Sequence, residues 1–355
     1  MTKLELLSKE YSQYKLSNKI YKRLCNNLSK NKKGNYEIRN ILERLMLCLH
    51  NINYNKDTKY SIYRKIDFRN TCIKKLFIEF KEKQKYLKRK VTKLDIKKYI
   101  LDEIVKFYKE EEIEIFDRVK IQYIENKIVF KDIIVRVNPL ILTNIKKRKD
   151  IDIALMITRY NTILSRGQQW GIPLEQYNNL YKNYGIKNEG FASPLNSRMS
   201  IYKDGKFCSL FYDTDKPFGS LGSYFDVEML YKDNIGWTVN PPYVDFILVK
   251  SAKKIIKTVN KAIKLNKRIM IYYIMPGWFD SEAYTLLNNY KNTKYMEILK
   301  EKTYFYEYGG KNIVGVFKSI VFVLDSYKEI VDYSNINDGM KLYKQNNKKY
   351  KKYKK

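Results

Sequence analysis

This sequence is poor in the residues that build disulfide frameworks and metal sites. Its 355 residues include four cysteines and one histidine, and no two cysteines form a C-x-x-C pair. Such scattered cysteines argue against a structural zinc site, whose ligands come in closely spaced pairs, and against a disulfide framework. The sequence therefore predicts a protein without a metal in a reducing compartment, either the cytoplasm or the nucleus.

Long apolar runs are also missing. No run approaches the roughly 18 residues that a membrane span needs. The first ten residues, MTKLELLSKE, lack the apolar core of a signal peptide. We therefore expect no membrane partner.

Acidic residues are scarce and unevenly placed. The chain has 38 acidic and 70 basic side chains, a formal net charge of +32. Residues 1–100 carry 27 basic and 9 acidic side chains, and residues 341–355 carry 8 basic and none acidic. Basic flanks around a nearly neutral centre are typical of proteins that bind phosphate backbones. Lysine enrichment from AT-rich coding is the alternative explanation.

The apolar patterns divide the chain into three expected parts. Residues 1–140 read as a basic, mainly helical accessory and RNA-binding domain with a β-hairpin near 116–137, and helical spacing extends through the basic run 81–90. Residues 141–333 read as an α/β core, because strand, NPPY, helix and strand follow one another as in a crossover unit. Residues 334–355 read as a basic disordered tail.

The motif Asn240-Pro241-Pro242-Tyr243 ends a strand-like run, where ligands bind in open α/β sheets. The Asn240 side-chain oxygen and the Pro241 carbonyl, whose direction Pro242 restricts, are suited to accept the two N–H groups of a planar amine. Tyr243 is suited to stack on a base, and its hydroxyl is expected to be optional. The alternative is a plain Pro-Pro turn with an Asn cap.

A glycine-containing loop, residues 213–226 (DTDKPFGSLGSYFD), precedes the motif. Gly219 and Gly222 permit close approach of a cofactor to the backbone. Asp213, Asp215 or Asp226 are candidates for binding its ribose hydroxyls or amino group. The loop lacks the Walker pattern of a phosphate-binding loop.

Several ordered motifs together resemble one family. EGFASPLNSR, FCSLFYDTDKPFGSLGSYFD and NPPYVD, followed by IMIYYIMPGWFD and YEYGG, resemble the cap-specific adenosine N6-methyltransferases known as phosphorylated-CTD-interacting factors. The resemblance covers about residues 150–325. It implies a Rossmann-like, S-adenosylmethionine-dependent methyltransferase core with an N-terminal, mainly helical accessory domain. The implied reaction methylates the N6 amine of the cap-adjacent (2′-O-methyl)adenosine of mRNA.

The resemblance also assigns residues. It makes Asn240, Pro241, Pro242 and Tyr243 the catalytic motif. The elements expected to line the cofactor pocket contain Asn196, Asp213, Phe218, Gly219 and Ser220. Tyr243 stands where the family usually has Phe, and the family's WW domain has no counterpart here, although transcription or capping machinery remains an expected partner. The compact, AT-rich chain suggests a virus or a protist.

Other functions and residues stay open at this point. NPPY also occurs in DNA and internal-RNA adenine methyltransferases and in enzymes that methylate protein glutamine. A non-catalytic RNA-binding subunit is a further alternative. The basic flanks and the FASPLN element favour nucleic acid. Arg159-Tyr160, residues 168–170 and Trp278 are expected either near the substrate or in the packing of the core.

Overall fold

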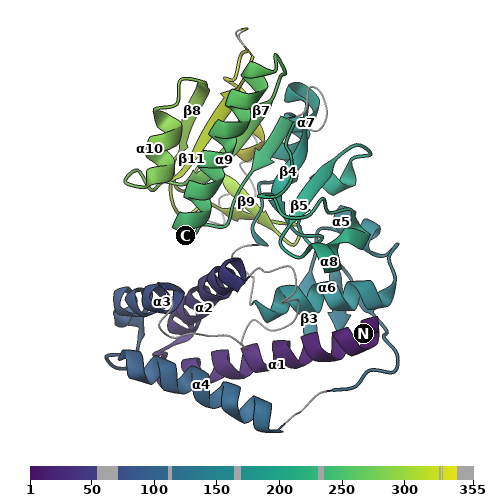
Figure 1. The fold of residues 1–355 in the computed structure, drawn as a ribbon, viewed down its shortest axis with the longest axis vertical. Coiled ribbons are helices and arrows are strands. Elements are labelled where there is room, and N and C mark those ends of the chain that lie inside the picture. The colour runs from purple at the N-terminus through teal and green to yellow at the C-terminus, as the bar shows by residue number, and fades with distance from the viewer. Residues whose placement is uncertain are drawn as a thin grey trace, which may run out of the picture. The chain divides into compact units, whose positions relative to one another are not determined.

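The computed structural model describes residues 1–53, 71–110, 114–163, 169–230, 236–327, 329 and 331–341. The chain forms two compact units, and Figure 1 shows its elements coloured by residue number. The first unit combines Met1–Ile124, Ile128–Val135 and Lys149–Gly167, and the second takes the remaining residues. The units interleave along the chain, so the single boundary expected at residue 140 does not separate them.

Helices dominate the first unit. They are α1 (Lys3–Leu28), α2 (Lys32–Asn53), α3 (Thr71–Glu82), α4 (Lys93–Glu110) and α6 (Asp150–Thr162). The long helix α1 packs against α2, α4 and α6. On α6, Arg159 is buried and forms an ion pair of 2.7 Å with the buried Glu10 of α1. Arg159 therefore serves the packing of this unit.

The predicted hairpin has three strands rather than two. The strands β1 (Gln122–Ile124), β2 (Lys127–Phe130) and β3 (Ile133–Arg136) form one sheet in that order. Glu125 in the first turn and Lys131 in the second both have a φ of 53°. The second turn divides the run that the sequence suggested as one strand.

The basic run after α3 also differs from expectation. The helix ends at Glu82, and a 3₁₀ turn, η1 (Gln84–Tyr86), follows it. Leu87 then forms an antiparallel bridge with Ser29. This pairing with the end of α1 stops the helix that the spacing predicted through residue 90.

The second unit is built on a six-stranded mixed sheet. Its order is β5 (Lys206–Ser209), β4 (Ile186–Ala192), β6 (Gly236–Val239), β7 (Met270–Pro276), β11 (Ser319–Asp325) and β8 (Thr293–Leu299). The strands from β5 to β7 are parallel to their neighbours, whereas β11 is antiparallel to both β7 and β8. The α/β class predicted from the sequence is confirmed.

Shorter elements complete this unit. The helices are α5 (Pro139–Ile145), α7 (Leu174–Tyr184), α8 (Tyr212–Asp215), α9 (Asp245–Lys264) and α10 (Glu282–Asn288). The 3₁₀ turns are η3 (Met199–Ile201), η4 (Lys216–Phe218) and η5 (Asp338–Met340). A two-stranded sheet pairs β9 (Phe305–Tyr308) with β10 (Lys311–Val314).

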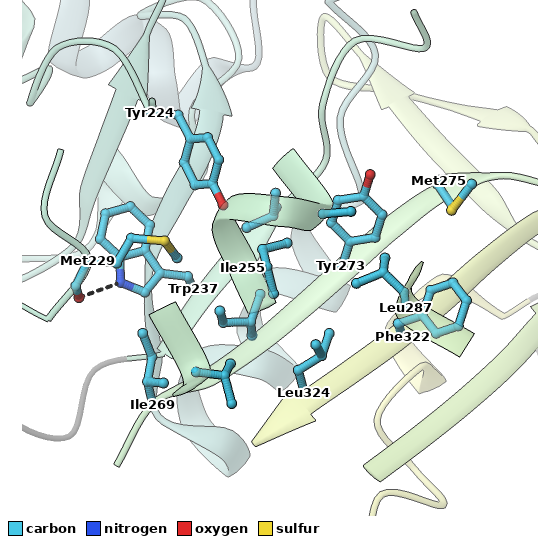
Figure 2. Close-up of a cluster of buried hydrophobic side chains, with 14 of the residues drawn as sticks. Tyr224, Met229, Trp237, Ile255, Ile269, Tyr273, Met275, Leu287, Phe322 and Leu324 are labelled. Carbon is cyan, nitrogen blue, oxygen red and sulfur yellow. Dashed lines mark hydrogen bonds between the residues drawn. The ribbon is translucent and has the colours of Figure 1, made fainter. Parts of the chain in front are cut away.

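Both faces of the large sheet are buried at its centre. Every residue of β7 is buried, and its side chains alternate between two apolar clusters, as the period of a strand requires. One cluster contains Ile271, Tyr273 and Met275 with the apolar face of α9, and Figure 2 shows part of it. The other cluster includes side chains from α7 and β9. The sheet is thus a rigid support for the loops at its edges.

Two further expectations fail in this unit. The apolar pattern of residues 224–230 (YFDVEML) is that of a short strand, but these residues form turns between β5 and β6. A disordered tail was expected from residue 334 onward. Instead, η5 (Asp338–Met340) forms within this range, and Ile336 and Met340 are fully buried. Residues 342–355 of the predicted tail lie outside the described residues.

Candidate active site at the carboxyl ends of three parallel strands

The three sequence motifs follow three neighbouring strands. The run SPLNSR comes after β4, the 213–226 loop follows β5, and NPPY follows β6. Because β5, β4 and β6 are parallel neighbours, their carboxyl ends share one edge of the sheet. The chain goes from β4 to β5 on one side and then to β6 on the other, so a topological switch point lies between β4 and β6. Ligands of open α/β sheets bind at such a point.

The NPPY motif forms the turn between β6 and α9. Pro241 is buried, and the Val244 amide donates to the Pro242 carbonyl at 2.7 Å before α9 begins. The Asn240 side chain is partly exposed and makes no hydrogen bond to any residue that the structure describes. Its carboxamide is therefore available to a ligand at the end of β6.

A chain of hydroxyl groups fixes the ring of Tyr243. The Tyr243 and Tyr306 hydroxyls are hydrogen-bonded, and Tyr306 meets the Ser319 hydroxyl at 2.9 Å. The Tyr243 ring packs edge-on against Phe317, with centroids 5.9 Å apart and planes at 80°. Burial raises the pKa of both tyrosine hydroxyls above the ordinary value. These hydroxyls therefore remain protonated and able to donate throughout the neutral range.

The turn after β4 is closed by its own polar side chains. The Asn196 oxygen accepts from the Ser193 amide at 2.7 Å, and the Asn196 nitrogen donates to the Gln169 carbonyl at 3.3 Å. The Ser193 hydroxyl also contacts the Gln169 side chain at 2.7 Å. Asn196, a predicted cofactor residue, is thus engaged in shaping this turn.

A buried polar cluster anchors the same turn to the sheet. Glu189 of β4 accepts hydrogen bonds from the Ser197 hydroxyl and the Arg198 amide, both at 3.0 Å. Burial raises the pKa of this carboxyl. The Arg198 side chain forms a buried ion pair with Glu307 of β9. Two motifs that are distant in sequence, FASPLNSR and YEYGG, are therefore joined directly.

The loop after β5 has both engaged and open positions. The Ser220 hydroxyl is buried and lies 2.6 Å from that of Ser209, which holds the loop against β5. Asp215 is fully buried beside Thr214, so it does not face solvent. Gly219 has a φ of 96°, and a Cβ added there would meet no atom within 4 Å. The loop thus presents free space in front of its backbone.

The remaining predicted residues are placed as follows. Asp213 and Asp226 are exposed, Phe218 is buried, and Gly222 has a φ of 99° beside the Tyr212 ring. Trp278 follows β7 and is 39% exposed. Trp170 lies near the Tyr306 ring, with centroids 6.3 Å apart, whereas Gln168 is outside the described residues.

Sequence reasoning missed the roles of Tyr306, Glu307, Ser319 and Arg198. YEYGG was noted as a motif, but its partners come from contacts across the fold. The sequence did contain one indication of the ion pair: Glu307 lies between two tyrosines in an apolar strand pattern. A charge buried in a strand normally has a partner of opposite charge.

The described residues contain neither a metal-binding group nor a membrane-spanning helix. Among them, no group of three or more His, Cys, Asp or Glu side chains is arranged to hold a metal ion. No helix in the described ranges has both the length and the apolar character to cross a membrane.

Comparisons with known proteins bear on this same region. A family described as "Phosphorylated CTD interacting factor 1 WW domain" matches residues 143–309, the range from α5 into β9. Two proteins named mRNA (2′-O-methyladenosine-N(6)-)-methyltransferase, from Mus musculus and Homo sapiens, are each 34% identical over 82 residues. That alignment covers 23% of this chain and 10% of each relative, so the chain spans about a tenth of their length. The resemblance drawn from the motifs is thereby confirmed: through residues 143–309, this chain is similar to the phosphorylated CTD interacting factor family.

Proposed function

We propose that this chain is an S-adenosylmethionine-dependent RNA methyltransferase acting on the N6 amine of the cap-adjacent (2′-O-methyl)adenosine of mRNA. The observation that carries the proposal is the unbonded Asn240 carboxamide of NPPY at the switch point between β4 and β6. The strand order, with β11 alone antiparallel in the six-stranded sheet, supports a Rossmann-like core. The names of the two relatives support the substrate.

The residues at this edge fit the proposed cofactor. The open space before Gly219 accommodates a ligand against the backbone, and the exposed Asp213 and Asp226 offer acceptors for hydroxyl or amino groups. Bound there, S-adenosylmethionine would supply an electrophilic methyl group. Asn196 and Ser220 would contribute by shaping the two loops, because their side chains are engaged within the protein.

The chain's own part in the reaction is to hold the amine. The Asn240 oxygen and the Pro241 carbonyl would accept its two N–H groups, and the Tyr243 ring would support the base by stacking, which is worth roughly 1–3 kcal/mol. Such acceptors would orient the nitrogen lone pair and stabilise the positive charge that develops on it. A cap-adjacent adenosine is unpaired, so no duplex needs to be opened.

Methyl transfer to defined RNAs tests the proposal. The substrates are a capped RNA beginning with A, the same RNA with an uncapped triphosphate, and a capped RNA whose only adenosine is internal. Nucleoside mass spectrometry should find N6-methyl-2′-O-methyladenosine chiefly in the first. Equal rates with and without the cap, or a preference for the internal site, would indicate a general adenine methyltransferase. Transfer only to DNA or to a glutamine peptide would exclude the RNA assignment.

Substitution of Asn240 tests the site itself. Asn240→Ala should lower kcat by about 10²–10³, since loss of such a contact typically costs roughly 3–4 kcal/mol. Cofactor binding, measured by calorimetry, should persist. Asn288→Ala, at an exposed position of α10, is the matched control and should be neutral. Activity of Asn240→Ala within a few-fold of the parent would refute the assignment.

A further inference from the structure

A cluster of lysines without a carboxylate partner among the described residues lies on two paired loops of the first unit and on the first turn of α2. One loop joins α1 to α2, and the other joins α3 to α4. The Lys88 amide donates to the Leu28 carbonyl at 2.7 Å, and the Lys30 amide donates to the Tyr86 carbonyl at 3.1 Å. The two loops are therefore held as one surface.

A glycine makes this close pairing possible. A Cβ added at Gly34 would lie 2.4 Å from the Ser29 Oγ and 2.5 Å from the Tyr86 carbonyl oxygen. Side-chain contacts reinforce the pairing, because the Lys88 ammonium donates to the Asn26 carbonyl at 2.7 Å. The surface is thus formed before any ligand arrives.

Five exposed lysines on this surface define what we call the paired-loop patch: Lys30, Lys33, Lys85, Lys88 and Lys90. Among the described residues, none of them forms an ion pair with a carboxylate. The Lys33 and Lys85 ammoniums lie 4.8 Å and 5.1 Å from the centroid of the Tyr86 ring. Their proximity lowers the pKa of the Tyr86 hydroxyl, chiefly through a hydrogen bond from Lys33.

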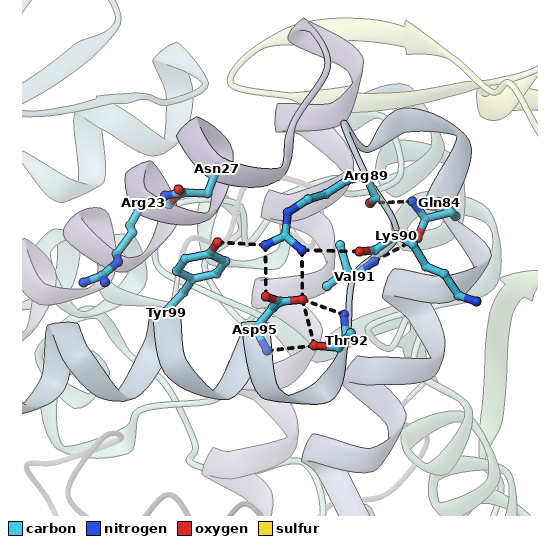
Figure 3. Close-up of polar contacts among 9 residues, drawn as sticks. All are labelled: Arg23, Asn27, Gln84, Arg89, Lys90, Val91, Thr92, Asp95 and Tyr99. Atoms are coloured by element: carbon cyan, nitrogen blue, oxygen red, sulfur yellow. Dashed lines mark hydrogen bonds and ion pairs between the residues drawn. The ribbon is translucent and has the colours of Figure 1, made fainter.

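Two other cations of the same loops differ. Arg89 is turned toward Asp95 and Tyr99 and makes two hydrogen bonds to the carboxylate, at 2.9 and 3.0 Å, whereas the Lys90 side chain points away from them (Figure 3). Lys83 lies 3.6 Å from Glu37. These two charges are satisfied internally, so only part of the basic run 81–90 is available to a ligand.

Several lysines elsewhere are neutralised in the same way. Lys253 pairs with Glu282, and Lys261 pairs with Glu228. The five ammonium groups of the paired-loop patch repel one another, because no carboxylate among the described residues neutralises them. A bound polyanion would relieve this repulsion. From this contrast we infer that the paired-loop patch binds the sugar–phosphate backbone of single-stranded RNA without reading its sequence. The choice of RNA as the polyanion rests on the proposed function.

The test compares charge variants in the full chain. Lys33→Ala/Lys85→Ala/Lys90→Ala removes three ammoniums and leaves Lys30 and Lys88, which hold backbone carbonyls across the loops. Lys291→Ala/Lys294→Ala/Lys300→Ala removes three exposed lysines in the second unit and is the matched control. Thermal melting should show that both variants fold like the parent. Gly34→Ala is a third variant, which disturbs the pairing without changing the charge.

Binding is measured by fluorescence anisotropy of an oligouridine between 50 and 250 mM KCl. Each phosphate contact on a single strand contributes about −0.7 to the slope of log K against log [salt]. The patch variant should therefore flatten the slope by about 2 and lower the affinity by roughly 10² at 0.1 M salt. The control should retain both, and Gly34→Ala should bind more weakly than the parent.

An unchanged slope in the patch variant, an equal loss in the control, or normal binding by Gly34→Ala would overturn the inference. Loss of binding to phosphatidylserine vesicles with unchanged RNA binding would overturn it in favour of a membrane surface. Oligouridine contains no adenosine, so this measurement does not depend on catalysis. Methyl transfer to a capped dinucleotide, too short to reach a second surface, tests the proposed function separately.

Discussion

The hydrogen bonds among the Tyr243, Tyr306 and Ser319 hydroxyls should determine how firmly the ring of Tyr243 in NPPY is held. Tyr306→Phe removes the hydroxyl that bonds Tyr243 on one side and Ser319 on the other. Tyr306 is 2% exposed and Ser319 is fully buried, so water does not readily replace the lost partner. The perturbation leaves the Tyr243 ring in place but frees its hydroxyl.

The magnitude follows from counting hydrogen bonds. Each lost bond costs about 0.5–1.5 kcal/mol, and a buried hydroxyl left unsatisfied costs about 1–3 kcal/mol. Tyr306→Phe should therefore lower the free energy of unfolding by about 2–3 kcal/mol. Tyr243→Phe should lower it by about 1 kcal/mol, because Tyr306 keeps its bond to Ser319. The double variant should show a coupling of about 1 kcal/mol between the two hydroxyls.

Two measurements check this reasoning. Urea denaturation gives the coupling and needs no activity, so it remains valid whatever the substrate. In methyl transfer, Tyr243→Phe should be mild and lower kcat by less than about tenfold, a change of 1.36 kcal/mol, because the ring that stacks is retained. Tyr243→Ala should be far more severe, because it also removes stacking worth roughly 1–3 kcal/mol. A coupling of zero, or equal kcat losses in Tyr243→Phe and Tyr243→Ala, would refute the view that the hydroxyl fixes a stacking ring.

Three further predictions concern other parts of the second unit. Glu307→Gln should lower the free energy of unfolding by about 3–5 kcal/mol in urea titrations, because it removes the ion-pair partner of the buried Arg198; a loss under 1 kcal/mol would contradict this. Burial raises the pKa of the Cys208 thiol to about 12, so mass spectrometry after alkylation at pH 8 should find it unlabelled in the native protein and labelled in urea. Labelling of Cys208 in the native protein at the rate of a free thiol would contradict its burial. Gly219→Val should destabilise the protein by about 1–2 kcal/mol through its positive φ and weaken cofactor binding in calorimetry, whereas unaltered binding would remove the loop from the cofactor site.

The sequence predicted the segment around NPPY well because its local patterns agree with one another. Residues 236–239 (GWTV) are strand-like, two prolines end the strand, and an amphipathic run begins at Asp245. The structure places β6, the turn and α9 there. The carboxyl-end position of the motif followed from that order alone.

Residues 224–230 form turns despite a strand-like apolar pattern, because tertiary contacts bind their backbone carbonyls. The Phe225 and Val227 carbonyls accept hydrogen bonds from the Lys254 ammonium at 3.2 and 2.7 Å. The Met229 carbonyl accepts from the Trp237 indole at 3.2 Å, as Figure 2 shows. Side-chain donors thus satisfy backbone groups that a neighbouring strand would otherwise satisfy.

Among the elements that the sequence did not predict, two give a weak local pattern. The strand β8 lies at the edge of the sheet, and its apolar residues do not alternate with polar ones, because Met296 and Ile298 are exposed while Glu297 between them is partly buried. The helix α10 is short, although Ser281 caps it through the Tyr284 amide at 3.2 Å. That cap was visible in the sequence and would have predicted a helix start after Trp278.

The candidate site depends on β9 more than any motif suggested. Successive side chains of a strand point to opposite faces, and β9 uses this with Tyr306 and Glu307. Tyr306 meets Tyr243 of NPPY, whereas Glu307 holds Arg198 in the turn after β4. The backbone of Glu307 also pairs with Gly171, next to the segment that contacts Asn196. One short strand thus fixes the loops on both sides of the switch point, which explains how partly exposed loops can keep the spacing that the proposed methyl-transfer site requires.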